Sequence, residues 1–284
     1  MRRWMAVGAA LALCVAGVAG CTSDAEKAAG AKKQVLAAVK GLAGVESLDV
    51  RTGKARDGIL VHADVAIRPA TGNVATAVKQ LRAALMRADG VSALTLMLVV
   101  RRGSAEHDGR WYDGTAARDA FDRQADMWGQ TIDSGSFHRV LAMQQSTTQF
   151  MVSVQGWDGA AAARPAATAV YRNLVAAGAA AGMTADRLTL SAHPTEQMQV
   201  DSNGGAALTE PVLVAADQLA KLDGVTAVTA SGGPSAPRLR FRVYPRGTSL
   251  TSAQRDRVLG TLRSAGVLTA DLQVRAGNGP VIWP

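Results

Sequence analysis

The chain has 284 residues, with 31 basic and 23 acidic side chains and a formal net charge of +8 at neutral pH. Only two cysteines are present, Cys14 and Cys21, so a disulfide-rich scaffold is excluded. A chain of this length can bury enough apolar surface to fold without disulfides, and its basic balance favours anionic neighbours.

The first twenty residues have the pattern of an export signal. Arg2 and Arg3 give a positive start, and an uncharged apolar run follows from Trp4 to Ala19. This run is shorter than the roughly 20 apolar residues that a membrane-spanning helix needs. We therefore predict that residues 1–20 form a secretory signal peptide rather than a transmembrane helix.

The signal ends in Val18-Ala19-Gly20-Cys21, in which an aliphatic and two small residues precede a cysteine. This segment resembles the lipobox of bacterial lipoprotein signal peptides. The resemblance implies that the thiol of Cys21 receives a diacylglyceryl group and that cleavage leaves Cys21 as the first mature residue. The alternative is an ordinary signal peptide with a chance cysteine. One acyl chain holds a protein at a membrane only marginally, whereas two chains anchor it stably.

Processing at this position would change the composition of the folded part. With Cys14 removed and Cys21 acylated, no free thiol remains, which excludes intrachain disulfides, cysteine nucleophiles, thiolate zinc sites and iron–sulfur clusters. Loss of Arg2 and Arg3 leaves 29 basic against 23 acidic residues, a net charge of +6. We expect an exported protein that faces anionic lipid, wall polymer or acidic ligands, and we expect no nucleic acid.

Residues 21–33 are mostly small and polar, and they predict a lipidated tether that runs into a helix. Residues 34–102 then form a unit with the order helix, strand, strand, helix, strand. Its first helix has apolar residues at helical spacing, and residues 61–67 alternate as a half-buried strand does. Asn73 is a candidate cap for the second helix. The apolar run 94–100 predicts a last strand that is covered on both faces.

Two further units, 115–193 and 210–284, follow the same order. Pro211 suits the first turn of a helix, and Thr251 to Gln254 matches a capping box. The segments 101–114 and 193–209 are rich in turn formers and charge, and their composition predicts linkers. A shared Thr-Ala-Asp sequence before the last strand, at 184–186 and 269–271, indicates that the units repeat.

These patterns predict an α+β protein with two to three repeated units, each a small sheet covered by two helices. The element order, with Gly44-Val45 and Gly90-Val91 before strands, resembles the BON domain of bacterial envelope proteins. That family is associated with phospholipid membranes and envelope maintenance. The family's central Leu-x-Gly strand motif is missing from this chain. A ferredoxin-like sandwich is therefore an alternative.

We find no pattern that indicates a catalytic or metal centre. His62 and Asp64 share a strand face but lack a third ligand. Asp133, Ser136 and His138 are close in sequence, and we interpret them as a polar loop entering a strand rather than a hydrolase triad. We therefore predict no catalytic residue, no metal and no cofactor.

The tryptophans beyond the leader are candidates for stacking on sugars or for a membrane interface. Trp128 shares a helical face with Phe121, so we predict that it lies in the core. Trp157 directly follows a strand, and Trp283 lies at the end of the chain. We interpret both of these as packing anchors rather than ligand platforms.

The most distinctive pattern is the stretch Arg238-Leu239-Arg240-Phe241-Arg242-Val243. Because side chains alternate along a strand, Arg238, Arg240 and Arg242 form an outward stripe, and Arg246 follows closely. Like charges on one strand repel, and guanidinium groups suit bidentate binding of phosphate or carboxylate. These four arginines are a candidate anion-binding site. The alternative is a solvated face whose arginines pair with acids on neighbouring strands, such as Asp271.

The leading functional hypothesis is a non-enzymatic envelope lipoprotein that binds or scaffolds. It would be exported and held on the extracytoplasmic side of the cell membrane by lipid on Cys21, with anionic lipid, wall polymer or an envelope protein as partner. One alternative is a carrier of a lipid or glycolipid, which predicts an apolar cavity between a sheet and its helices. Another is an envelope-modifying hydrolase, which predicts a concave pocket with converging acids.

Overall fold

The computed structural model describes residues 21–70, 72–114, 118–134, 137–145, 149–155, 167–184, 187–195, 198–203, 208–233 and 239–283. The predicted signal peptide lies outside these ranges. So do Ser136, Trp157 and Arg238, and the Ala-Asp part of the Thr-Ala-Asp sequence at 185–186.

Within the described residues, one order of elements occurs three times: helix, strand, strand, helix, strand, strand. The helices are α1 (Cys21–Lys40), α2 (Val74–Leu85), α3 (Arg118–Asp133), α4 (Ala167–Ala180), α5 (Glu210–Leu219) and α6 (Ser252–Ser264). The strands are β1 (Val45–Ala55), β2 (Gly58–Ile67), β3 (Val91–Arg102), β4 (Ala105–Gly114), β5 (Arg139–Gln144), β6 (Phe150–Gln155), β7 (Leu188–Thr195), β8 (Met198–Asn203), β9 (Val225–Gly232), β10 (Leu239–Pro245), β11 (Leu272–Ala276) and β12 (Val281–Trp283).

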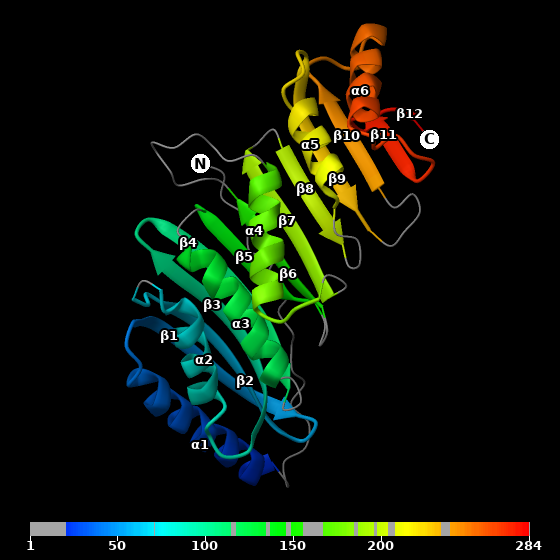
Figure 1. The fold of residues 1–284 in the computed structure, drawn as a ribbon. Helices are drawn as coiled ribbons and strands as arrows, with labels where there is room; N and C mark the ends of the chain where they lie inside the picture. Colours follow the sequence, from blue (N-terminus) through cyan, green and yellow to red (C-terminus); the bar gives the residue numbers. More distant parts are fainter. Residues whose placement is uncertain are drawn as a thin grey trace.

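All these strands belong to one mixed sheet of twelve strands, in sequence order from β1 to β12 (Figure 1). The predicted fold of separate small sheets, BON-like or ferredoxin-like, is therefore wrong. The segments predicted as linkers contain β4 and β8, which join the thirds of the sheet. β4 is antiparallel to β3 and parallel to β5, and β8 is antiparallel to β7 and parallel to β9.

β4 shows why composition alone indicated a linker. Of its inward positions, Ala105, His107 and Trp111 are buried, and Gly109 lies between the last two. Its outward positions are charged or polar: Glu106, Asp108, Arg110 and Tyr112. A strand with one solvated face carries this much charge without losing its pairing.

The helices cover only one face of the sheet (Figure 1). Consecutive helices contact one another from α1 to α6, so the molecule has two layers, a row of helices and a sheet. This arrangement corrects the prediction for residues 94–100 of β3. Leu94, Leu96 and Leu98 are buried under the helices, but Met97 is 41% exposed on the other face. The run is apolar because Met97 and Val99 occupy outward positions of β3, and not because a second layer covers that face.

The residues predicted as a tether are helical, because α1 begins at Cys21. Ala31, Val35 and Val39 of α1 are buried against the sheet. Residues 24–27 of α1 are exposed, and Lys54 of β1 forms an ion pair with Asp24 at 3.4 Å. Among the described residues, none of the helices has the length and apolar character needed to cross a bilayer.

An aromatic cluster joins the first and middle thirds of the sheet. Trp111 of β4 lies 5.4 Å from Phe121 and 5.1 Å from Trp128 of α3, and 6.3 Å from Phe150 of β6, between ring centroids. All four rings are buried, which confirms the core position predicted for Trp128 and excludes Trp111 as a stacking platform. Gly109 makes room for this cluster, because a Cβ atom there would overlap the Trp111 ring.

The first turns of α6 and α5 form as their local sequences predict, whereas the first turn of α2 does not. Thr251 and Gln254 form the predicted capping box of α6, and Pro211 lies in the first turn of α5. Asn73 makes no capping hydrogen bond to α2. Instead, the carboxylate of Asp133 on α3 accepts hydrogen bonds from the backbone N–H groups of Gly72 (3.0 Å) and Val74 (3.2 Å).

Candidate functional site

The described helices all cover one face of the sheet, and we call the opposite face, which carries none of them, the open face. The strand registers align its side chains in rows that cross the sheet. One row runs from β3 to β11 through Val99, Asp108, Leu141, Ser153, Ser191, Asp201, Ser231, Arg240 and Gln273. The open face is therefore one continuous surface rather than three separate patches.

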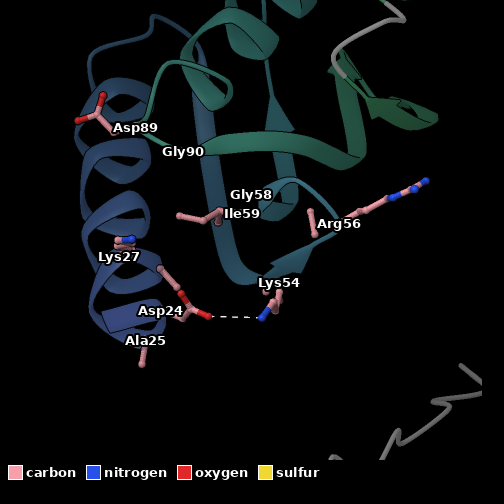
Figure 2. A pocket seen from close by; sticks show the side chains of 12 residues that line it. Asp24, Ala25, Lys27, Lys54, Arg56, Gly58, Ile59, Asp89 and Gly90 are labelled. Atoms are coloured by element: carbon pink, nitrogen blue, oxygen red, sulfur yellow. Dashed lines mark hydrogen bonds and ion pairs between the residues drawn. The ribbon is translucent and has the colours of Figure 1, made fainter. Parts of the chain in front are cut away.

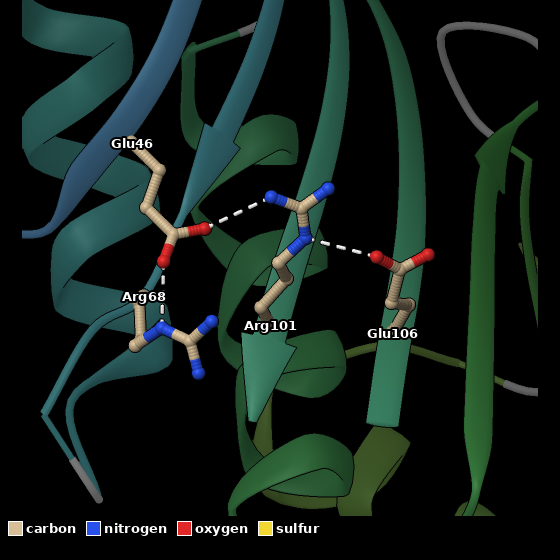
Figure 3. A network of polar contacts seen from close by, with 4 residues as sticks. All are labelled: Glu46, Arg68, Arg101 and Glu106. Carbon is tan, nitrogen blue, oxygen red and sulfur yellow. Dashed lines mark hydrogen bonds and ion pairs between the residues drawn. The ribbon is translucent and has the colours of Figure 1, made fainter. Parts of the chain in front are cut away.

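In the first third of the sheet, Arg51, Arg68 and Arg101 are matched by carboxylates, as Figure 3 shows for the last two, whereas Arg110 of β4 forms no ion pair among the described residues. Glu46 accepts hydrogen bonds from Nε of Arg68 at 2.6 Å and from Nη1 of Arg101 at 3.1 Å. Arg101 also donates to Glu106 at 2.9 Å. Hydrogen bonds from Arg68 and Arg101 lower the pKa of Glu46, and those to Glu106 and Glu46 raise the pKa of Arg101.

Two further ion pairs continue this matching on the open face. Arg51 of β1 lies 2.9 Å from Asp64 of β2, and Arg139 of β5 lies 2.6 Å from Asp108 of β4. Asp64, which shares a strand face with His62, thus has Arg51 as its partner. No group of three or more histidine, cysteine or acidic residues that could hold a metal occurs in the described part of the chain.

The last third differs, because it holds a small pocket lined by arginines. Arg240 and Arg242 of β10 lie beside Gln273 and Arg275 of β11, since the two strands pair in parallel and place Arg240 opposite Gln273 and Arg242 opposite Arg275. With the backbone of Phe241, they enclose about 250 Å³. We call this site the arginine pocket.

The arginines of this pocket are not matched by carboxylates. Among the described residues, Arg240, Arg242 and Arg275 form no ion pair, and Arg275 donates only to the amide oxygen of Gln273, at 3.2 Å. The Nε atom of Arg240 is buried and has no hydrogen-bond partner there. A buried N–H group without a partner is costly, so this atom is a donor available to an anion.

The structure therefore places only part of the predicted site together. Arg240 and Arg242 lie in the pocket, whereas Arg246 follows β10 and its backbone N–H donates to the carbonyl of Gly224. Arg238 lies outside the described residues. Asp271, the predicted pairing partner, forms no ion pair within the described residues, and its carbonyl accepts a hydrogen bond from the backbone of Leu239.

Gln273 and Arg275 were missed by the sequence reasoning. Their alternation along the last predicted strand was visible, but nothing local says which strand lies beside them. Only the parallel pairing of β10 with β11 brings them next to Arg240 and Arg242. The equivalent parallel pairs in the other two thirds carry different side chains in the same places. They are His62, Asp64, Thr95 and Met97 in β2 and β3. In β6 and β7 they are Met151, Ser153, Thr189 and Ser191.

The arginine pocket is thus specific to the last third of a framework that repeats across the sheet. It offers guanidinium donors and one amide to a phosphate or carboxylate group, and no acid or nucleophile lines it. No protein-family model matches this chain, and comparison with curated proteins finds no significant match.

Proposed function

We propose that this protein is an exported lipoprotein of the bacterial envelope that acts as a non-enzymatic scaffold and binds an anionic wall polymer in the arginine pocket. Lipid on Cys21 would hold one end of the scaffold at the cell membrane. The observation that carries the proposal is the group Arg240, Arg242 and Arg275, which no carboxylate of the described residues neutralises.

The electrostatics of the pocket favour an external anion. Three guanidinium groups on adjacent strands repel one another, and the first third of the same sheet shows how this chain otherwise compensates arginines. A phosphate or carboxylate would neutralise the repulsion, and it would also accept a hydrogen bond from Nε of Arg240. Hydrogen bonds to charged groups are worth about 1.5–3 kcal/mol each.

The position of the pocket favours a polymer over a lipid headgroup. Twelve strands spaced about 4.8 Å apart make the sheet roughly 50 Å wide. Helix α1, which begins at Cys21, packs on β1, whereas the pocket lies on β10 and β11 near the opposite end (Figure 1). A protein anchored by its first mature residue would thus present the pocket away from its own membrane.

Paired variants test the ligand proposal. Replacing Arg240 and Arg242 with glutamine should weaken binding of the full-length protein to purified wall fragments roughly 10- to 100-fold. The control removes two exposed arginines of α6, Arg255→Gln with Arg257→Gln, and so makes the same change in net charge without touching the pocket. An equal loss of wall binding in both variants would mean that net charge, and not the arginine pocket, causes the effect. If the parent protein binds phosphatidylglycerol vesicles through these arginines but does not bind wall fragments, the ligand of the pocket is anionic lipid rather than wall polymer.

The anchor is tested separately. Palmitate labelling of the protein should disappear in Cys21→Ala, and globomycin, which blocks lipoprotein signal cleavage, should leave a longer precursor. Mass spectrometry of the exported protein should find the diacylglyceryl group on Cys21. An unmodified amino terminus further along the chain would refute the anchor.

A further inference from the structure

A second hollow, which we call the α1 pocket, lies where α1 begins. Three segments surround it: the first turns of α1, the turn between β1 and β2, and the turn before β3 (Figure 2). It has a volume of about 850 Å³, which lies within the usual range of ligand sites. Its walls are mostly small or apolar, with Ala25, Ala28, Ala55 and Ile59 alongside three glycines.

Charged groups stand at the rim of this pocket, and its acids are already bound. Asp24 forms the ion pair with Lys54 at 3.4 Å, and Asp89 bonds to Gln34 through both its carboxylate and its backbone N–H. The lining also holds Lys27 and Arg56, and neither forms an ion pair with another described residue. Its three cations, Lys27, Lys54 and Arg56, outnumber its two acids, Asp24 and Asp89. The pocket therefore combines an apolar wall with two cations available to a ligand.

We propose that the α1 pocket binds an anionic phospholipid, with an acyl chain against Ala28 and Ile59 and the headgroup phosphate near Lys27. Arg56, which points away from α1 in Figure 2, adds positive charge on the other side of the mouth. Contact with these walls removes the apolar surface of the acyl chain from water, which favours binding. The cations attract the phosphate at the mouth. A zwitterionic lipid has no net charge, so it gains less from this rim.

The position of the pocket also favours a membrane lipid. Helix α1 begins at Cys21, one helical turn before Asp24 and Ala25 of the lining. In this respect the inference rests on the proposed function, because lipid on Cys21 would hold the mouth of the pocket at the headgroups. An anchored chain meets membrane lipid there at high local concentration.

The test uses full-length protein in vesicles that contain a phospholipid with a photoreactive acyl chain. Cross-links to phosphatidylglycerol should map to residues 24–28 and 53–59. Ala28→Phe, which fills the pocket, should reduce them about tenfold, and Lys27→Gln with Arg56→Gln should remove the preference for phosphatidylglycerol over phosphatidylcholine. The matched controls are Ala29→Phe and Lys32→Gln with Lys33→Gln, all at exposed positions of α1 outside the pocket.

The outcomes separate this inference from the proposed function. Arg240→Gln with Arg242→Gln should leave the cross-links unchanged, because those residues lie on β10. If Cys21→Ala releases the protein from vesicles, short-chain photoreactive phosphatidylglycerol supplied in solution should still label 24–28 and 53–59. Labelling that Ala28→Phe and Ala29→Phe reduce equally, or labelling by a free fatty acid alone, would overturn the inference.

Discussion

Asp133 should stabilise helix α2 although it lies 59 residues after the first helical residue, Val74. Its carboxylate accepts hydrogen bonds from the backbone N–H of Val74, a first-turn donor that the helix itself cannot satisfy, and from that of Gly72 just before the helix. The Asp133 side chain is only 19% exposed, so water does not fully replace it in a truncated variant. Arg102 also approaches the carboxylate, at 3.5 Å, and would lose this neighbour.

The expected cost of Asp133→Ala is about 1–2 kcal/mol in the free energy of unfolding, the usual value for a lost helix cap. Asp133→Asn keeps one oxygen acceptor and should lose about half as much. Asn73→Ala should stay within about 0.5 kcal/mol of the parent protein, because Asn73 makes no capping bond.

Urea denaturation of the three variants, followed by far-ultraviolet circular dichroism, measures these differences. A larger loss in Asn73→Ala than in Asp133→Ala would mean that the local residue caps α2. The assignment of the cap to α3, and with it one contact between the first and middle thirds of the sheet, would then be wrong.

Two further predictions concern the same part of the molecule. Gly129→Ala should lower the free energy of unfolding by about 1–3 kcal/mol, since a Cβ atom there would lie 2.5 Å from the backbone N of Ala75 and force α2 and α3 apart. The control is Gly260→Ala, which has open space around it and should be neutral or stabilising. Thermal denaturation measures both. Glu46 has a pKa lowered below its ordinary value of 4.5 by Arg68 and Arg101, so its contribution to stability is present above that value and is lost as the pH falls through the folded-state pKa. The melting temperature of Glu46→Gln should thus fall below that of the parent at pH 7 and approach it as the carboxyl is protonated at acidic pH. A difference that does not change with pH would contradict the network in Figure 3.

Local patterns predicted those features that depend on neighbouring residues in the chain. The apolar spacing in α2 predicts its buried face, and Val74, Val78 and Leu85 are all buried. The capping box at Thr251 forms as its sequence indicates, because all its atoms belong to one helical turn. The prediction that Asn73 caps α2 was wrong, because its side chain makes no capping bond. A carboxylate from α3, distant in the sequence, instead accepts from Val74, the first residue of the helix, and from Gly72 just before it.

The largest error was to predict linkers where β4 and β8 connect one repeat of the element order to the next. A polar stretch such as 105–114 is compatible with a linker or with a strand that has one solvated face, and its composition does not distinguish them. In the structure this stretch is strand β4, because it pairs with β3 on one side and with β5 on the other. The order of strands in a sheet depends on which backbone edges remain unpaired, and this is a property of the assembled fold.

From the sequence alone follow the thiol-poor composition, the expectation of a lipid on Cys21, the alternation of helices and strands, and the outward arginines of β10. Each of these depends on residues within a few positions of one another. Only the tertiary structure joins twelve strands into one sheet, leaves one face open, and places Arg275 beside Arg242 and the first turns of α1 beside the β1–β2 turn. Those contacts depend on strand pairing between segments distant in the chain, which the period of side chains along a single strand does not determine.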